Sequence, residues 1–146
     1  MHSNSSADRP ARGLLEAAFG VLRAEAPAHH DLVRDAVARL RVHLVIGGER
    51  FAPHAADGRL AVGDAADPAA VTVTTSLAAA LALLDARRTL IEAVDAGELD
   101  VRGSADALDA AADAFSLFLH GMVRAPSSAR LLDELRARVA GAEPGG

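Results

Sequence analysis

The stretch IEAVDAGELDVRGSADAL, residues 91–108, decides the fold. Its first part has apolar residues at helical spacing and reaches Gly97, a residue type that commonly ends helices. Leu99 and Val101 then alternate with charged residues, as in a strand with one buried face. Ser104 follows, and serine is a preferred cap at the start of a helix. The stretch therefore predicts a helix, one short strand and a second helix.

Hairpin signals occur in the first half of the chain. Apolar and polar residues alternate on both sides of a Gly-Gly pair at 47–48, and an Asp-Gly pair at 57–58 marks the next turn. The segment VTVTT at 71–75 has one apolar and one polar face, as a further strand would. Pro53 lacks the N–H that a strand needs, so it is expected to weaken the second strand. Three hairpin-linked strands and a fourth are predicted.

Two helices are predicted before the strands. The first begins near Pro10, because proline fits the first turn of a helix, and the second follows Pro27. Apolar residues at helical spacing predict the buried stripe of the second helix: Leu32, Val33, Ala36, Val37 and Leu40.

Four more helices are predicted after the fourth strand. The first has Thr75 or Ser76 as its cap, and Thr89 with Glu92 forms a capping box for the next. A long helix begins at Ser104, and a last one covers residues 128–141.

This order of elements predicts an α+β fold, with helices over one face of a mixed, mostly antiparallel sheet. We expect the helical connection to let the fourth and fifth strands pair in parallel. A chain of 146 residues is most simply one domain. That domain is expected at 11–142, between tails at 1–10 and 143–146.

Composition excludes several classes of protein. The net charge is −5, no run of arginines forms a stripe, and Tyr and Trp are absent, which argues against nucleic-acid binding. The longest uncharged run, residues 68–84, is shorter than the roughly 20 residues of a membrane-spanning helix. The N-terminus has no apolar segment of a secretory signal. We therefore expect a cytoplasmic protein without a transmembrane segment.

No reactive motif is found. His29 and His30 are adjacent on a helix, so they project about 100° apart and are expected to be solvated at a capped helix start rather than to bind a metal. His43 and His54 lie on neighbouring strands and are expected to form a surface pair. Nucleophile motifs and phosphate-binding glycine loops are absent. We predict no catalytic residue, no metal and no cofactor.

The second half is unusually rich in large apolar residues. Leu83 and Leu117 widen the apolar arcs beyond one packing face. Two interpretations are open, namely the packed core of a small domain and an apolar cavity between sheet and helices.

Residues 69–108, AAVTVTTSLAAALALLDARRTLIEAVDAGELDVRGSADAL, resemble the sterol carrier protein 2 family. The resemblance extends over roughly residues 40–123 and includes the Asp-Gly turn at 57–58, whereas Ser104 and Pro53 depart from the family pattern. It implies a five-stranded sheet in the order 3-2-1-4-5 and a hydrophobic tunnel that binds fatty acyl chains, sterols or isoprenoid lipids without catalysis. The residues expected to line the tunnel are Val71, Val73, Leu81, Leu84, Leu90, Val94, Phe115, Phe118, Leu119 and Met122.

Two other functions are considered. The chain could serve as an accessory or interaction module of a biosynthetic assembly, with its last helix docking a protein partner or a second copy as a homodimer. It could also be a small enzyme that acts on a hydrophobic intermediate in the tunnel. That enzyme would need an acid or base there, and the available candidates are His43, His54 and Asp100.

Overall fold

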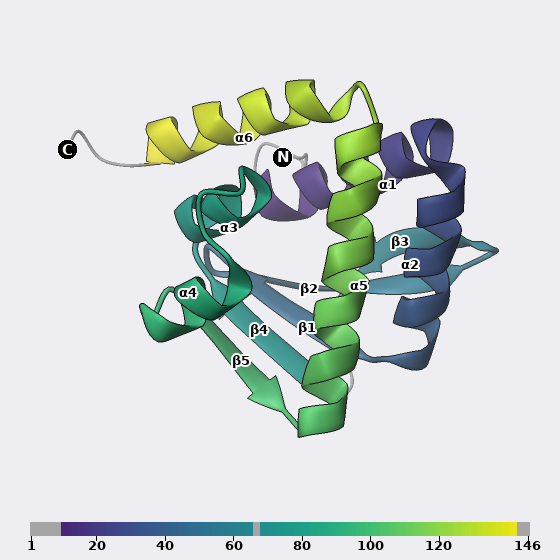
Figure 1. Cartoon of the computed structure of the whole chain (residues 1–146), viewed down its shortest axis with the longest axis horizontal. Helices are drawn as coiled ribbons and strands as arrows, with labels where there is room; N and C mark the ends of the chain where they lie inside the picture. The colour runs from purple at the N-terminus through teal and green to yellow at the C-terminus, as the bar shows by residue number, and fades with distance from the viewer. Residues whose placement is uncertain (1–9, 66–67, 143–146) are drawn as a thin grey trace, which may run out of the picture.

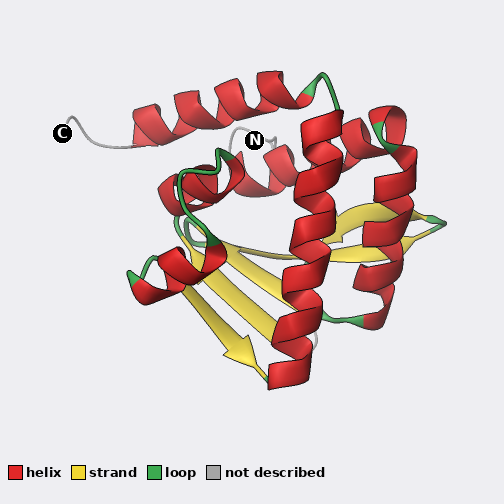
Figure 2. Ribbon diagram, in the orientation of Figure 1, coloured by secondary structure: helices red, strands yellow, loops and turns green. Residues whose placement is uncertain are grey.

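Six helices and one five-stranded sheet make up the part of the chain that the computed structural model describes, residues 10–65 and 68–142. Helices cover one face of the sheet (Figures 1 and 2). The elements in chain order are α1 (Pro10–Glu25), α2 (Pro27–Arg39), β1 (Val42–Ile46), β2 (Glu49–Ala56), β3 (Arg59–Gly63), β4 (Val71–Thr75), α3 (Leu77–Leu84), α4 (Leu90–Asp95), β5 (Leu99–Gly103), α5 (Ala105–Arg124) and α6 (Ser128–Ala142). The tails expected at 1–10 and 143–146 fall almost wholly outside the described residues.

The strand order is β3-β2-β1-β4-β5, which confirms the predicted α+β fold and sheet order. The prediction of a parallel pair between the fourth and fifth strands is wrong, because β4 and β5 are antiparallel and the parallel pair is β1 with β4. The register explains the difference. Thr75, the last residue of β4, lies opposite Leu99, the first residue of β5. Helices α3 and α4 therefore close a wide hairpin and do not carry the chain back across the sheet.

Strand β2 passes through Pro53 without ending. The pairs between β1 and β2 run from Ile46↔Glu49 to Leu44↔Phe51. Beyond Phe51 the strand pairs with β3. Pro53 therefore lies where no registered partner from β1 stands beside it, and its missing N–H interrupts no ladder between β1 and β2.

Local side chains cap the helices that the sequence predicts. The Ser76 hydroxyl accepts a hydrogen bond from the N–H of Ala79, and the capping box of Thr89 and Glu92 is complete. Ser104 caps α5 in the same way. These caps fix where α3, α4 and α5 begin.

A distant carboxylate caps the first helix. Glu49, at the start of β2, accepts hydrogen bonds from the backbone N–H groups of Ala11, at 2.8 Å, and Arg12, at 3.2 Å. These N–H groups belong to the first turn of α1, and the N–H groups of a first turn have no acceptor within their own helix. These hydrogen bonds connect the start of α1 to the sheet. No local pattern in the sequence predicts them.

The face that α2 buries differs from the predicted stripe. Leu32 is half exposed, whereas His30 is only 2% exposed. His30 occupies an inward position because its ring has a hydrogen-bond partner there, the N–H of Leu60 on β3. The expectation that this histidine is solvated is therefore wrong.

Helix α4 also presents a different face from the one that its apolar pattern indicates. Ile91 is 75% exposed and Val94 is 48% exposed, whereas Ala93 is buried against Leu99 of β5. The small side chain of Ala93 lets this two-turn helix lie close to the strand. Leu90 packs at the same contact.

Candidate ligand site between sheet and helices

The inner face of the sheet is apolar across its central strands. Along β1 the residues Val42, Leu44 and Ile46 alternate with His43 and Val45, and Leu44 and Ile46 pack against the main core. Every residue of β1 is only half buried, although the strand lies in the middle of the sheet. Leu44 and Ile46 therefore keep some accessible surface although they pack against the core.

The inward residues of the neighbouring strands differ in burial, and Val73 of β4, which lies opposite Leu44, is half buried as well. Phe51, which lies opposite Leu44 on β2, is 0% exposed, and so is Val71, which lies opposite Val42 on β4. The helices lie on one side of the sheet (Figure 1). Leu44 and Val73, which lie opposite each other on β1 and β4, both keep accessible surface.

Aromatic residues on α5 stand over this apolar face. The rings of Phe118 and Phe19 meet edge to face with centroids 6.1 Å apart, and those of Phe118 and Phe115 stack at 6.4 Å. Phe115 packs against both apolar clusters of the molecule. One cluster lies under α1, α2 and α5, and the other under α3 and α4. Phe115 therefore stands where the two clusters join.

The predicted lining residues are placed in three ways. The structure buries three of them: Val71, Leu81 and Phe118. Six are half buried: Val73, Leu84, Leu90, Phe115, Leu119 and Met122. Val94 alone among them is exposed, on the outer side of α4. Leu84, Phe115, Phe118 and Met122 meet in the main cluster, and Val73 and Leu90 meet Phe115 in the second.

Polar groups near this apolar space are already paired. The Thr75 hydroxyl, on the inner face of β4, donates a 2.8 Å hydrogen bond to the carbonyl oxygen of Glu98. The guanidinium of Arg88 binds the carboxylate of Glu98 through two hydrogen bonds of 2.9 and 2.8 Å. The hydrogen bond from Arg88 lowers the pKa of Glu98 and raises that of Arg88.

Helix α6 lies across one end of the molecule, over α1 and α3 (Figure 1). The carboxylate of Glu25 accepts hydrogen bonds from the hydroxyl and the backbone N–H of Ser127, which lower the pKa of Glu25. Arg136 binds Asp85 at the end of α3 at 3.1 Å. The apolar residue Leu135 is buried. The central apolar residue of α6 is therefore covered by this chain, while docking of a partner on α6 stays a prediction.

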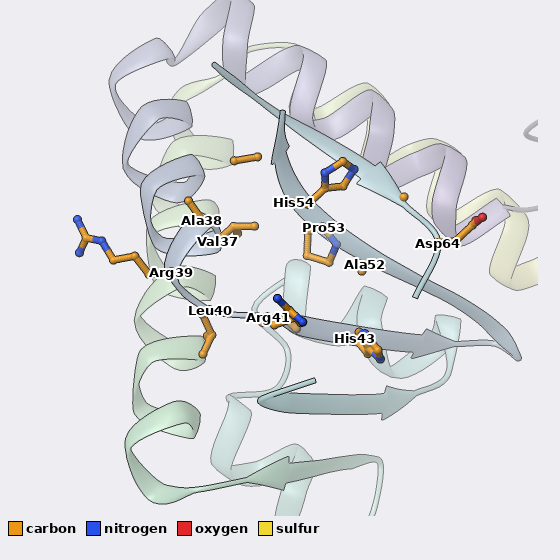
Figure 3. Close-up of a pocket in the computed structure, with 13 residues that line it drawn as sticks. Val37, Ala38, Arg39, Leu40, Arg41, His43, Ala52, Pro53, His54 and Asp64 are labelled. Carbon is orange, nitrogen blue, oxygen red and sulfur yellow. The ribbon is translucent and has the colours of Figure 1, made fainter. Parts of the chain in front are cut away.

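The polar candidates for catalysis lie on the uncovered face of the sheet. His43 and His54 border a shallow groove of about 590 Å³ between the end of α2, β1, β2 and β3 (Figure 3). The His54 ring lies against Gly63 of β3. Asp100 alternates with the inward residues of β5 and binds Arg102 on its own strand at 2.8 Å. None of the three faces the apolar interior.

No group of three or more His, Asp or Glu side chains that could hold a metal ion occurs among residues 10–65 and 68–142. Within the same residues, no helix has the length and apolar character needed to cross a membrane.

No protein-family model matches the chain, and no curated protein matches it in sequence. Solved structures do match. A protein described as UbiJ-SCP2, a ubiquinone synthesis protein, superposes with a TM-score of 0.57 over 77% of this chain and 92% of its own, at 17% identity. The chain has the sterol carrier protein 2 fold. Sterol carrier protein 2 from Yarrowia lipolytica is a more distant structure, with a TM-score of 0.47 over 75% of this chain and 86% of its own, at 14% identity.

Proposed function

We propose that this protein binds an apolar small molecule, such as a fatty acyl chain, a sterol or an isoprenoid, between the sheet and the helices, without catalysing a reaction. The observation that supports the proposal most directly is the incomplete burial of the inward residues of β1. Leu44 and Ile46, and Val73 opposite Leu44 on β4, are only half buried, whereas Phe51 and Val71 beside them are sealed. Surface of that kind gains free energy when an apolar molecule covers it.

The chemistry of the surroundings supports an apolar ligand. The clusters that border Leu44 contain aliphatic and aromatic side chains, and the Thr75 hydroxyl beside them is already bonded. A charged headgroup buried there would have no counter-ion, so the polar end of a ligand is expected to stay at the surface. Each buried methylene contributes about 0.8 kcal/mol. A chain of about ten methylenes would then offset the free-energy cost of association, at least about 4 kcal/mol, with a modest surplus.

A tryptophan scan of β1 tests the proposal. Leu44→Trp adds volume on the inner face of the strand, and Val45→Trp adds the same group to the next residue, on the outer face. If the inner face borders a cavity, the new side chain of Leu44→Trp fills it. The affinity for a fatty acid, measured by displacement of a fluorescent fatty acid, should then fall at least about ten-fold while the variant stays folded. Val45→Trp should bind as the unaltered chain does. The chain has no tryptophan of its own, so each variant also carries a single fluorescent reporter.

The opposite result has a distinct signature. In a filled core, Leu44→Trp overpacks the interior and lowers the free energy of unfolding by about 1–3 kcal/mol. That loss, together with no binding by the unaltered chain to any acyl, sterol or isoprenoid probe, would contradict the proposal.

A second candidate function is an accessory role in a quinone-biosynthesis assembly. The superposition on the UbiJ-SCP2 ubiquinone synthesis protein supports it, since that structure covers most of both chains. The same displacement assay separates the two candidates. A carrier of general lipids should bind fatty acids and polyprenyl quinones similarly, whereas an accessory protein of this kind should prefer the polyprenyl quinone at least about ten-fold.

A further inference from the structure

The outer edge of β5 has a defined hydrogen-bonding pattern. In β4, the N–H of Val71 donates to the carbonyl of Arg41 just before β1, at 3.2 Å, so the peptide groups of Val71 face β1. Peptide groups alternate in direction along a strand, and those of Thr72 and Thr74 therefore face β5.

The register extends this alternation to β5. Arg102 lies opposite Thr72, so Arg102 and Asp100 direct their peptide groups toward β4. The remaining peptide groups of the strand point outward. They belong to Leu99, Val101 and Gly103. β5 is the last strand of the sheet, and within the described residues no strand pairs with this side.

The sequence of β5, Leu-Asp-Val-Arg-Gly, is complementary to itself when two copies run antiparallel. A two-fold axis at Val101 places Val101 opposite its own copy, and the two residues exchange N–H···O=C hydrogen bonds. Asp100 of each copy then lies opposite Arg102 of the other. Their side chains share the uncovered face of the sheet, since Asp100 and Arg102 already bind each other at 2.8 Å within one strand. Pairs of this kind, between the hydrogen-bonded positions, have the shortest distance between side chains.

Unpartnered apolar side chains lie on the helix next to this edge. Helix α4 packs on β5 through Ala93 and Leu99. Its other side exposes Ile91 and Val94, two of the most exposed large apolar residues among those described. Apolar surface of this kind is typical of a contact with another molecule. It adds area to an interface that a five-residue strand alone would leave small.

We propose that a second copy of this chain pairs antiparallel along β5, with the two-fold axis at Val101, so that two sheets join into one. The inference goes beyond lipid binding and does not depend on it. A closed two-fold contact uses the same patch on both copies, as the self-complementary charges require. Because the strand is short, the dimer is expected to be weak and to depend on protein concentration.

Charge exchange tests the proposed pairing. Asp100→Arg and Arg102→Asp each place like charges opposite one another twice per dimer, and each should weaken dimerisation about ten-fold in light scattering across a concentration series. The double variant Asp100→Arg/Arg102→Asp restores both opposite-charge pairs and should recover the dimer. Arg50→Asp makes the same change of charge as Arg102→Asp on β2, and should leave the dimer unaffected.

Amide exchange locates the contact. The amides of Leu99 and Val101 should exchange more slowly as protein concentration rises, whereas those of Asp100 and Arg102, which already face β4, should not change. A chain that is monomeric at every concentration would overturn the proposal. So would a dimer that the double variant fails to restore, or one in which the Val101 amide stays unprotected, since a different surface, such as α6, would then form the contact.

Discussion

The two edges of the sheet are treated differently. At the β3 edge, the ring of His30 accepts a hydrogen bond from the N–H of Leu60 at 3.1 Å, and Arg12 donates to the carbonyl of Val62 at 3.3 Å. At the β5 edge, no such side-chain contact to an outward peptide group is seen within the described residues. One edge is closed by side chains of this chain, and the other is available to a second chain.

The difference follows from where the helices lie. Helices α1 and α2 run beside β3 (Figure 1), so their side chains reach its outward peptide groups. Helix α4 instead lies on the inner face of β5. An uncovered edge is a template for pairing with another strand, and proteins commonly block it. The comparison teaches that the helix layer here both covers the core and determines which edge can pair.

The largest effect is expected from removing the His30 contact. Because Leu60 N–H donates to Nε2, the ring carries its hydrogen on Nδ1, which donates to Asp31 at 3.0 Å. His30→Ala leaves a buried N–H without a partner and removes a buried ring, and should lower the free energy of unfolding by about 2–4 kcal/mol in a denaturant titration. His30→Gln retains an acceptor and should lose less. Equal losses in both variants would show that the hydrogen bond does not close this edge.

A smaller effect is expected at the β5 edge. A Cβ added at Gly103 would lie 2.5 Å from the carbonyl oxygen of Ala70, so Gly103→Ala must displace the end of β5 from β4. The expected loss is about 1–3 kcal/mol of unfolding free energy. It should be accompanied by faster exchange of the Arg102 amide, because that amide faces β4. Gly97→Ala is the control, since an added Cβ there meets nothing within 4 Å and only its positive φ opposes the change. A Gly103→Ala variant with unchanged stability and exchange would contradict this close approach.

The smallest effect concerns acid stability at the β3 edge. The hydrogen bond from His30, with the nearby charge of Arg34, lowers the pKa of Asp31 below its ordinary 3.8. A carboxylate whose pKa is lowered on folding stabilises the protein above that value, and this contribution is lost as the pH falls through the folded pKa. The melting temperature of Asp31→Asn should therefore fall less than that of the unaltered chain between about pH 5 and pH 2. Asp109→Asn, at an exposed site on α5, should follow the unaltered chain, and an equal acid loss in all three proteins would contradict the prediction.

Much of the candidate site could be predicted from the sequence. The apolar periodicity of α5 indicated Phe115, Phe118 and Met122, and all three belong to or pack against the main apolar cluster. Val94 was predicted with them because its spacing fits a helix, but a short helix can turn either side inward. Leu44 and Ile46 could be recognised from the sequence, by its alternating pattern, as inward residues of a strand. Their incomplete burial could not be recognised, because accessible surface depends on what the helices leave uncovered.

The sequence by itself determined the order of the elements and where they begin. Caps such as Ser76 and Ser104 act within three residues, and the alternation along β5 is local, so both can be recognised without a fold. Only the tertiary structure decided the antiparallel direction of β5 and the burial of His30. The partner of His30 is 30 residues away along the chain, and the Glu49 cap of α1 is 38 residues away. Contacts over such distances form only when packing brings the elements together, and periodicity along the chain carries no information about them.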